Sequence, residues 1–75
     1  MEFVGDILKK TREGKKISLS NVSNELKISE QTLINLENNY LQKDIDKVYI
    51  IGHLRSYSSF LSLNHNKIIE LYKLQ

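Results

Sequence analysis

Cysteine and proline are absent from this 75-residue sequence, and glycine occurs at only three positions. Without cysteine, the chain can form neither a disulfide nor a thiolate metal site. The scarcity of helix-breaking residues favours helices over a turn-rich β fold. No run of 18 apolar residues occurs, so we expect no membrane-spanning segment within this stretch. The apolar stretch at residues 3–8 is short and interrupted by Asp6, unlike the core of a signal peptide.

The residues that are present are typical of one small globular domain. A chain of this length buries a small core, and 40% hydrophobic with 27% charged residues is the usual balance for a folded protein. The formal net charge of +2 permits contact with nucleic acid or an acidic surface but does not require it. We therefore expect a single intracellular, all-helical domain.

Four predicted helices start with the same local pattern. A residue that favours the N-cap position stands directly after one apolar residue and four positions before another, an arrangement called a hydrophobic staple. The four capping residues are Ser18, Ser29, Asp46 and Asn64. Together with an amphipathic first segment, these starts predict helices at residues 3–13, 18–26, 29–38, 47–63 and 65–73.

The second and third predicted helices are separated only by Lys27 and Ile28, and so tight a joint indicates a helix-turn-helix. A polar loop at residues 39–45 then leads to the fourth helix. We predict an all-α fold, a five-helix orthogonal array of the lambda-repressor type. Helical spacing predicts a hydrophobic core of Val4, Ile7, Leu8, Leu19, Val22, Leu26, Ile28, Leu33, Leu36, Leu54, Tyr57, Leu61 and Ile68.

The predicted helix at residues 47–63 has two apolar stripes rather than one. One side carries the core stripe, Ile50, Leu54, Tyr57 and Leu61. Almost opposite lies a second set, here called the outer stripe, Tyr49, His53, Ser56 and Phe60. A surface helix needs only one apolar face to join a core, so the outer stripe indicates a partner surface. For Phe60, packing under the following helix is an equal alternative.

Four segments carry a family resemblance: VGDILKKTRE, ISLSNVSNELKISEQTLINLEN, VYIIGHLRSYSSFLSL and IIELYK. They combine a phage-repressor-like helix-turn-helix with a downstream aromatic helix whose GHLRSY, residues 52–57, is similar to the pattern G-[FY]-[LI]-R-S-Y. In these features residues 4–74 resemble the N-terminal helix-turn-helix domain of the RodZ family. The chain departs from the pattern at His53, where an aromatic residue is usual, and at Lys16 and Lys27, where glycine is often found.

RodZ proteins are single-pass inner-membrane proteins of bacteria. Their cytoplasmic helix-turn-helix domain binds the actin-like filament protein MreB and helps to maintain rod shape. The resemblance implies that residues 1–75 form the N-terminal cytoplasmic domain of a longer membrane-anchored protein, monomeric itself, with an MreB-like partner. In the family, aromatic residues of the fourth helix make the contact, and the matching positions are Tyr49 and His53. Phe60 and then Ser56 are the next residues expected to contact the partner. The cations Lys43, Lys47 and Arg55 are expected near this surface.

An ion pair between Arg12 and Glu37 is also expected, because repressor-like domains often join the ends of the first and third helices in this way. Both residues match that pattern. If such a pair is partly buried, it fixes the packing of the helices more than it stabilises the fold, since desolvation offsets the attraction between the charges.

DNA binding is the alternative function, in which the protein is a transcriptional regulator of the phage-repressor class. The recognition helix would then be residues 29–38, with Gln31, Thr32 and Asn35 facing outward. Glutamine and asparagine can pair with adenine through two hydrogen bonds. However, this segment contains no lysine or arginine, and Glu30 at its start repels phosphate. We therefore predict weak DNA binding without sequence specificity.

Catalysis is not expected. The titratable candidates, His53 and His65, have no partner at the spacing of a catalytic motif. The sequence has no nucleophile motif, metal-ligand cluster or phosphate-binding glycine loop, so we predict no catalytic residue, metal or cofactor. The only basic concentration is interpreted as a solvated helix end in preference to a phosphate site, and consists of Lys9, Lys10, Arg12, Lys15 and Lys16.

Overall fold

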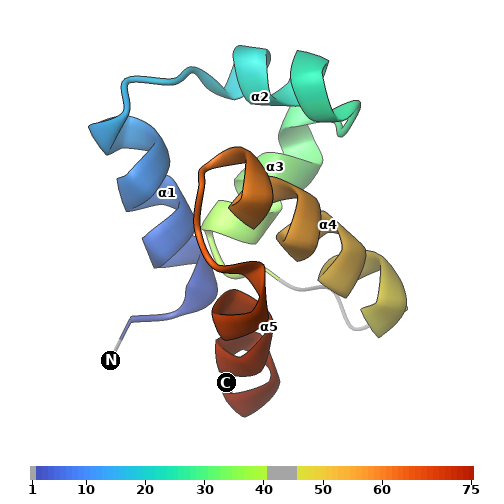
Figure 1. Cartoon of the computed structure of the whole chain (residues 1–75). Helices are drawn as coiled ribbons and strands as arrows, with labels where there is room; N and C mark the ends of the chain where they lie inside the picture. The colour runs from blue at the N-terminus through green and yellow to red at the C-terminus, as the bar shows by residue number, and fades with distance from the viewer. Residues whose placement is uncertain (1, 41–45) are drawn as a thin grey trace.

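The computed structural model describes residues 2–40 and 46–75. Within these residues it contains five helices and no strand, which confirms the predicted all-α helix-turn-helix fold (Figure 1). The helices are α1 (Val4–Gly14), α2 (Leu19–Leu26), α3 (Glu30–Glu37), α4 (Lys47–Phe60) and α5 (His65–Leu74). Lys43 and Ile45, which entered the predictions, lie outside the described residues. No described helix has the length and apolar character needed to cross a bilayer.

All four predicted N-caps are formed. Ser18 Oγ accepts a hydrogen bond from the Asn21 amide at 3.1 Å, and Ser29 Oγ accepts one from Thr32 at 3.2 Å. The side chains of Asp46 and Asn64 likewise accept bonds from the amides two residues later, at 3.1 and 3.0 Å. Each cap satisfies an amide that has no partner inside its helix, which explains why the helix starts agree closely with prediction.

The end of α4 differs from the prediction, because the helix stops at Phe60 and not at residue 63. Ser62 adopts a left-handed conformation with φ of 63°. The Ser62 amide then donates to the Ser59 carbonyl at 3.0 Å, and the Leu63 amide donates to Ser58 at 2.8 Å. This pair of bonds is a Schellman motif, which closes the helix and redirects the chain toward α5.

Residues in the left-handed conformation also follow α1, α2 and α3, and none of these residues is glycine. Lys16 and Lys27 each have φ of 58°, and Asn39 has φ of 60°. The two lysines occupy the positions where the resemblance led us to expect glycine. A Cβ atom makes the left-handed conformation unfavourable, so these helix ends are less stable than they would be with glycine.

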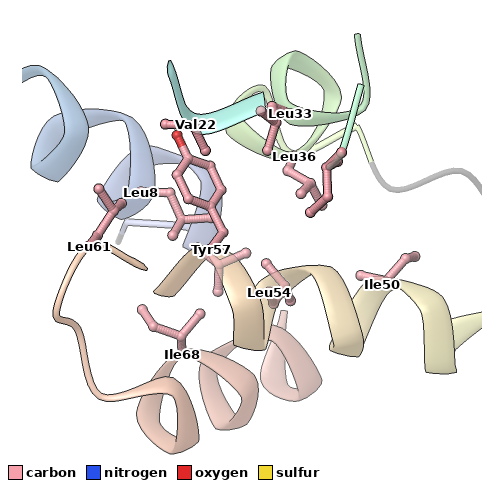
Figure 2. Close-up of a cluster of buried hydrophobic side chains, with 11 residues drawn as sticks. Leu8, Val22, Leu33, Leu36, Ile50, Leu54, Tyr57, Leu61 and Ile68 are labelled. Atoms are coloured by element: carbon pink, nitrogen blue, oxygen red, sulfur yellow. The ribbon is translucent and has the colours of Figure 1, made fainter. Parts of the chain in front are cut away.

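The core lies where α4 meets the other helices. Figure 2 shows Tyr57 and Leu54 of α4 among buried side chains that include Leu8, Leu33 and Ile68. Ten of the predicted core residues are buried, namely Val4, Leu8, Val22, Ile28, Leu33, Leu36, Leu54, Tyr57, Leu61 and Ile68.

Five residues were assigned differently from the structure. Ile7, Leu19 and Leu26 were predicted to be core residues but are only partly buried, because they pack against the edge of the cluster. Ile50 is buried, as its place in the core stripe predicts, although the list of core residues did not include it, and Ile69 is buried although neither prediction included it. Apart from Ile50, these residues lie at the margins of helical faces, where spacing alone does not decide burial.

Gly5 allows α1 to pack closely against the end of α3. A Cβ atom at this position would lie 2.3 Å from the Leu36 carbonyl oxygen and 2.5 Å from that of Glu37. The Gly5 amide donates to Oδ1 of Asn39 at 2.8 Å, and the Val4 amide donates to Oε1 of Gln75 at 3.0 Å. The free amides at the start of α1 are therefore capped by side chains that are distant in sequence.

Candidate functional site

Arg12 and Glu37 form a two-pronged ion pair between α1 and α3. Arg12 Nε donates to Glu37 Oε2 at 2.7 Å, and Arg12 Nη2 donates to Oε1 at 3.1 Å. The remaining guanidinium nitrogen, Nη1, donates to the carbonyl of Ile17 at 2.9 Å. The side chain of Arg12 is 12% exposed and that of Glu37 is 4% exposed, so the pair is largely removed from water. Its hydrogen bond to Glu37 raises the pKa of Arg12, which stays charged.

Tyr57 extends this network to α4. Its hydroxyl donates a hydrogen bond to Glu37 Oε2, so one carboxylate contacts side chains from two other helices. Burial, followed by the hydrogen bond to Glu37 and its charge, raises the pKa of Tyr57 well above its usual value. The network therefore holds α4 at a fixed position against the helix-turn-helix.

The outer stripe of α4 divides into two parts. Tyr49 is 66% exposed, Ser56 is exposed and His53 is half-buried. The rings of Tyr49 and His53 are neighbours, with centroids 6.3 Å apart. Phe60 is half-buried and packs against the core, which agrees with the alternative interpretation of this residue. Only the first three residues lie together on an accessible surface.

A groove of about 390 Å³ lies between this surface and the α2–α3 turn. One wall consists of Leu26, Lys27 and Ile28. The other wall comes from α4 and consists of Val48, Tyr49, Gly52, His53 and Ser56. Val48, which is 73% exposed, was missed, although a β-branched residue beside Tyr49 on a helix surface is a usable signal. The opposite wall could not be inferred from the periodicity of α4.

The candidate DNA-reading side chains on α3 already have local partners. Gln31 Nε2 donates to Asn35 Oδ1 at 3.0 Å, and the Thr32 hydroxyl is 2.8 Å from the hydroxyl of the N-cap residue Ser29. Gln31 is exposed, whereas Thr32 and Asn35 are half-buried. Neither α2 nor α3 contains lysine or arginine, and Glu30 is exposed at the start of α3.

Lys27 lies in the turn between α2 and α3, and the other described cations lie outside the helix-turn-helix. Lys9, Lys15 and Lys16 are exposed around the end of α1, and Lys10 pairs with Glu2 at 3.0 Å. Lys47 was expected near the outer stripe, but it lines a separate hollow of about 370 Å³ together with Ile51, Tyr72, Lys73 and Gln75. His65 Nδ1 lies 3.4 Å from the Ser59 hydroxyl. The described residues contain no group of three or more potential metal ligands.

Comparisons with known proteins agree with this architecture. A family model described as a helix-turn-helix domain matches residues 7–68. An uncharacterised protein of Haemophilus influenzae is 38% identical over 60 residues, which are 79% of this chain but only 20% of that protein, so the chain spans about a fifth of its length.

A solved structure also matches closely. YmfM of Staphylococcus aureus, a proposed DNA-binding membrane protein, has a TM-score of 0.87 and 28% sequence identity. The match covers 96% of this chain and 88% of that one. The extent of the family match, which includes both helices of the helix-turn-helix and all of α4, decides the classification. This chain belongs to the helix-turn-helix domain family.

Proposed function

We propose that this domain is a protein-binding helix-turn-helix module that contacts an MreB-like filament protein through α4 and acts in the maintenance of rod shape. The observation that supports this is the exposure of Tyr49, 66% accessible beside a groove, on a helix whose core stripe is fully buried. An exposed aromatic residue provides a large contact area at low entropic cost. The fold itself does not require Tyr49, since the core of α4 is complete without it.

The identity of the partner rests on the resemblance to the RodZ family. The GHLRSY segment at residues 52–57 lies in α4, and Tyr49 and His53 match the family's partner-binding aromatics. By the same resemblance, the domain lies on the cytoplasmic face of the inner membrane as the N-terminal part of a longer, membrane-anchored protein. The description of YmfM as a membrane protein supports this location.

DNA binding is a second candidate, and the comparisons favour it over a filament partner. YmfM is a proposed DNA-binding protein, and neither relative's description mentions a filament. The composition of α2 and α3 argues against DNA binding, because cations that contact phosphates supply most DNA affinity and neither helix contains lysine or arginine. Any specific readout would depend on Gln31, Thr32 and Asn35.

A binding titration tests the proposal. The MreB-like protein of the same organism is titrated with wild type, Tyr49→Ala and Gln31→Ala, and the fold of each variant is checked by circular dichroism. Loss of a central aromatic residue removes about 2 kcal/mol or more, so Tyr49→Ala is expected to bind roughly thirtyfold more weakly. Gln31→Ala, on the alternative DNA-reading surface of α3, should bind like wild type. Equal binding by wild type and Tyr49→Ala would refute the α4 contact.

A gel-shift titration tests the second candidate. At physiological salt we expect weak DNA binding with little preference among sequences, because α3 lacks cations. Discrimination of a defined site over random DNA by more than about a thousandfold would instead establish a regulator. Gln31→Ala should then reduce that discrimination, whereas Tyr49→Ala should not.

A further inference from the structure

Gly52 occupies the middle of α4 although the fold does not need a glycine there. Its φ is not positive, and a Cβ atom built on it would have nothing within 4 Å. Gly5 provides the contrast, because a Cβ there would collide with backbone oxygens. Glycine inside a helix is destabilising relative to alanine. Gly52 therefore weakens α4 without any benefit to packing or to backbone conformation.

The position of Gly52 in the groove indicates a role in binding and not in folding. It lines the groove between α4 and the α2–α3 turn, with Tyr49 three residues before it and Ser56 four residues after it on the same face. At this point no side chain stands between the groove and the backbone of α4. An incoming side chain can approach the helix more closely here than at any position that carries a Cβ.

We propose that Gly52 forms the floor of a docking site for one apolar side chain of the partner, presented next to an acidic residue. This inference rests on the proposed function and specifies the chemistry of the partner segment. The groove has apolar walls at Leu26, Ile28 and Val48, which suit an apolar side chain.

The cations near the groove are the reason to expect an acidic residue beside the docked apolar side chain. Lys27 lines the groove, and Arg55 is exposed three residues after Gly52, on the adjacent helix surface. No aspartate or glutamate is among the lining residues. In the part of the chain that the structure describes, neither cation forms an ion pair. A carboxylate beside the docked side chain would complement both of them.

The experiment compares Gly52→Ala and Gly52→Gln with Gly14→Ala in the full chain. Gly14 is a matched control, since it also lies in a helix with nothing within 4 Å of a built Cβ, but away from the groove. Both alanine variants should melt at the same temperature as wild type or higher. Only the Gly52 variants should weaken binding of the MreB-like protein, by about tenfold for alanine and more for glutamine.

The outcomes separate this inference from the function on which it rests. Binding that is lost with Tyr49→Ala but unchanged in both Gly52 variants would overturn the docking site and leave the proposed function standing. Absence of binding by wild type would overturn both. Lys27→Glu tests whether the partner segment is acidic, because repulsion between the new glutamate and an acidic segment should weaken binding relative to wild type. Unchanged or tighter binding by Lys27→Glu would overturn the acidic character of the partner segment.

Discussion

Tyr57 donates a hydrogen bond to Glu37, and this contact joins the helix that carries the candidate binding surface to the end of the helix-turn-helix. Because Arg12 binds the same carboxylate, α1, α3 and α4 share one buried polar centre. Glu37 is 4% exposed, so it depends on these two side chains in place of water. Substitution of any member of this network should therefore change the free energy of unfolding measurably.

Alkaline pH should destabilise the domain through Tyr57. In the unfolded chain a tyrosine loses its proton near pH 10, whereas burial and Glu37 raise the pKa in the folded protein. Above about pH 10 the unfolded state therefore binds fewer protons, and the free energy of unfolding falls by up to about 1.4 kcal/mol per pH unit. This contribution is complete below pH 10 and is lost as pH rises toward the folded pKa.

Urea unfolding of wild type and Tyr57→Phe between pH 8 and 11 measures this effect. Near neutral pH the variant should be less stable by about 1.5–3 kcal/mol, as expected for a hydrogen bond to a charged group. The difference between the two proteins should shrink as pH increases, because phenylalanine does not titrate. Parallel stability curves across this range would contradict the explanation.

Replacing Arg12 with methionine should destabilise the domain by about 3–5 kcal/mol, since it leaves the buried carboxylate of Glu37 without its cation. The double variant Arg12→Met, Glu37→Leu should recover part of this loss, because no unpaired charge remains, although the buried Tyr57 hydroxyl loses its acceptor. Lys10→Met provides the control, as its pair with Glu2 is exposed and should contribute little. Chemical denaturation gives all three values. A double variant as unstable as the single one would argue against unpaired charge as the cause.

Gly5→Ala should destabilise the domain by about 1–3 kcal/mol, because the added Cβ collides with backbone oxygens that cannot rotate away. Gly14→Ala adds the same methyl group in open space and should be neutral or stabilising. Thermal unfolding of the two variants measures the contrast. Similar melting temperatures would show that α1 and α3 can move apart easily.

Lys27→Gly should stabilise the domain by about 0.5–1 kcal/mol, since it relieves a left-handed lysine at the end of α2. Lys16→Gly should behave similarly. Asn39 has nearly the same backbone conformation, but its side chain accepts a hydrogen bond from the amide of Gly5. Asn39→Gly should therefore destabilise the domain. Denaturant midpoints distinguish the three variants. Stabilisation by all three would mean that the Asn39 cap contributes nothing.

The helix starts and four of the five helix ends agree with the sequence-based prediction to within one residue, and only the end of α4 was misplaced. A start depends on a side chain of a particular type, such as Ser18 or Asp46, and such residues are visible in a sequence. The ends depend on left-handed residues, and here these are lysine, asparagine and serine. Because no glycine marks Ser62, the predicted fourth helix continued too far.

The candidate site was predictable in part for a similar reason. Helical spacing separated Tyr49 and His53 from the core, since that distinction depends on one helix alone. The facing wall at Leu26–Ile28 depends on how α2 packs relative to α4, which spacing within a helix does not specify. Helical spacing predicts that the ring of Tyr57 lies in the core, but it does not identify Glu37 as the partner of its hydroxyl.

The hydrogen bond from the Val4 amide to Gln75 joins two residues that are 71 positions apart in the sequence. In Figure 1 the start of α1 and the end of α5 lie toward the bottom of the view, whereas the α2–α3 turn lies at the upper right. A tag, dye or solid support attached at either terminus would therefore leave the groove facing free solution. The same proximity makes the domain suitable for insertion into a loop of a host protein, entering and leaving at one place.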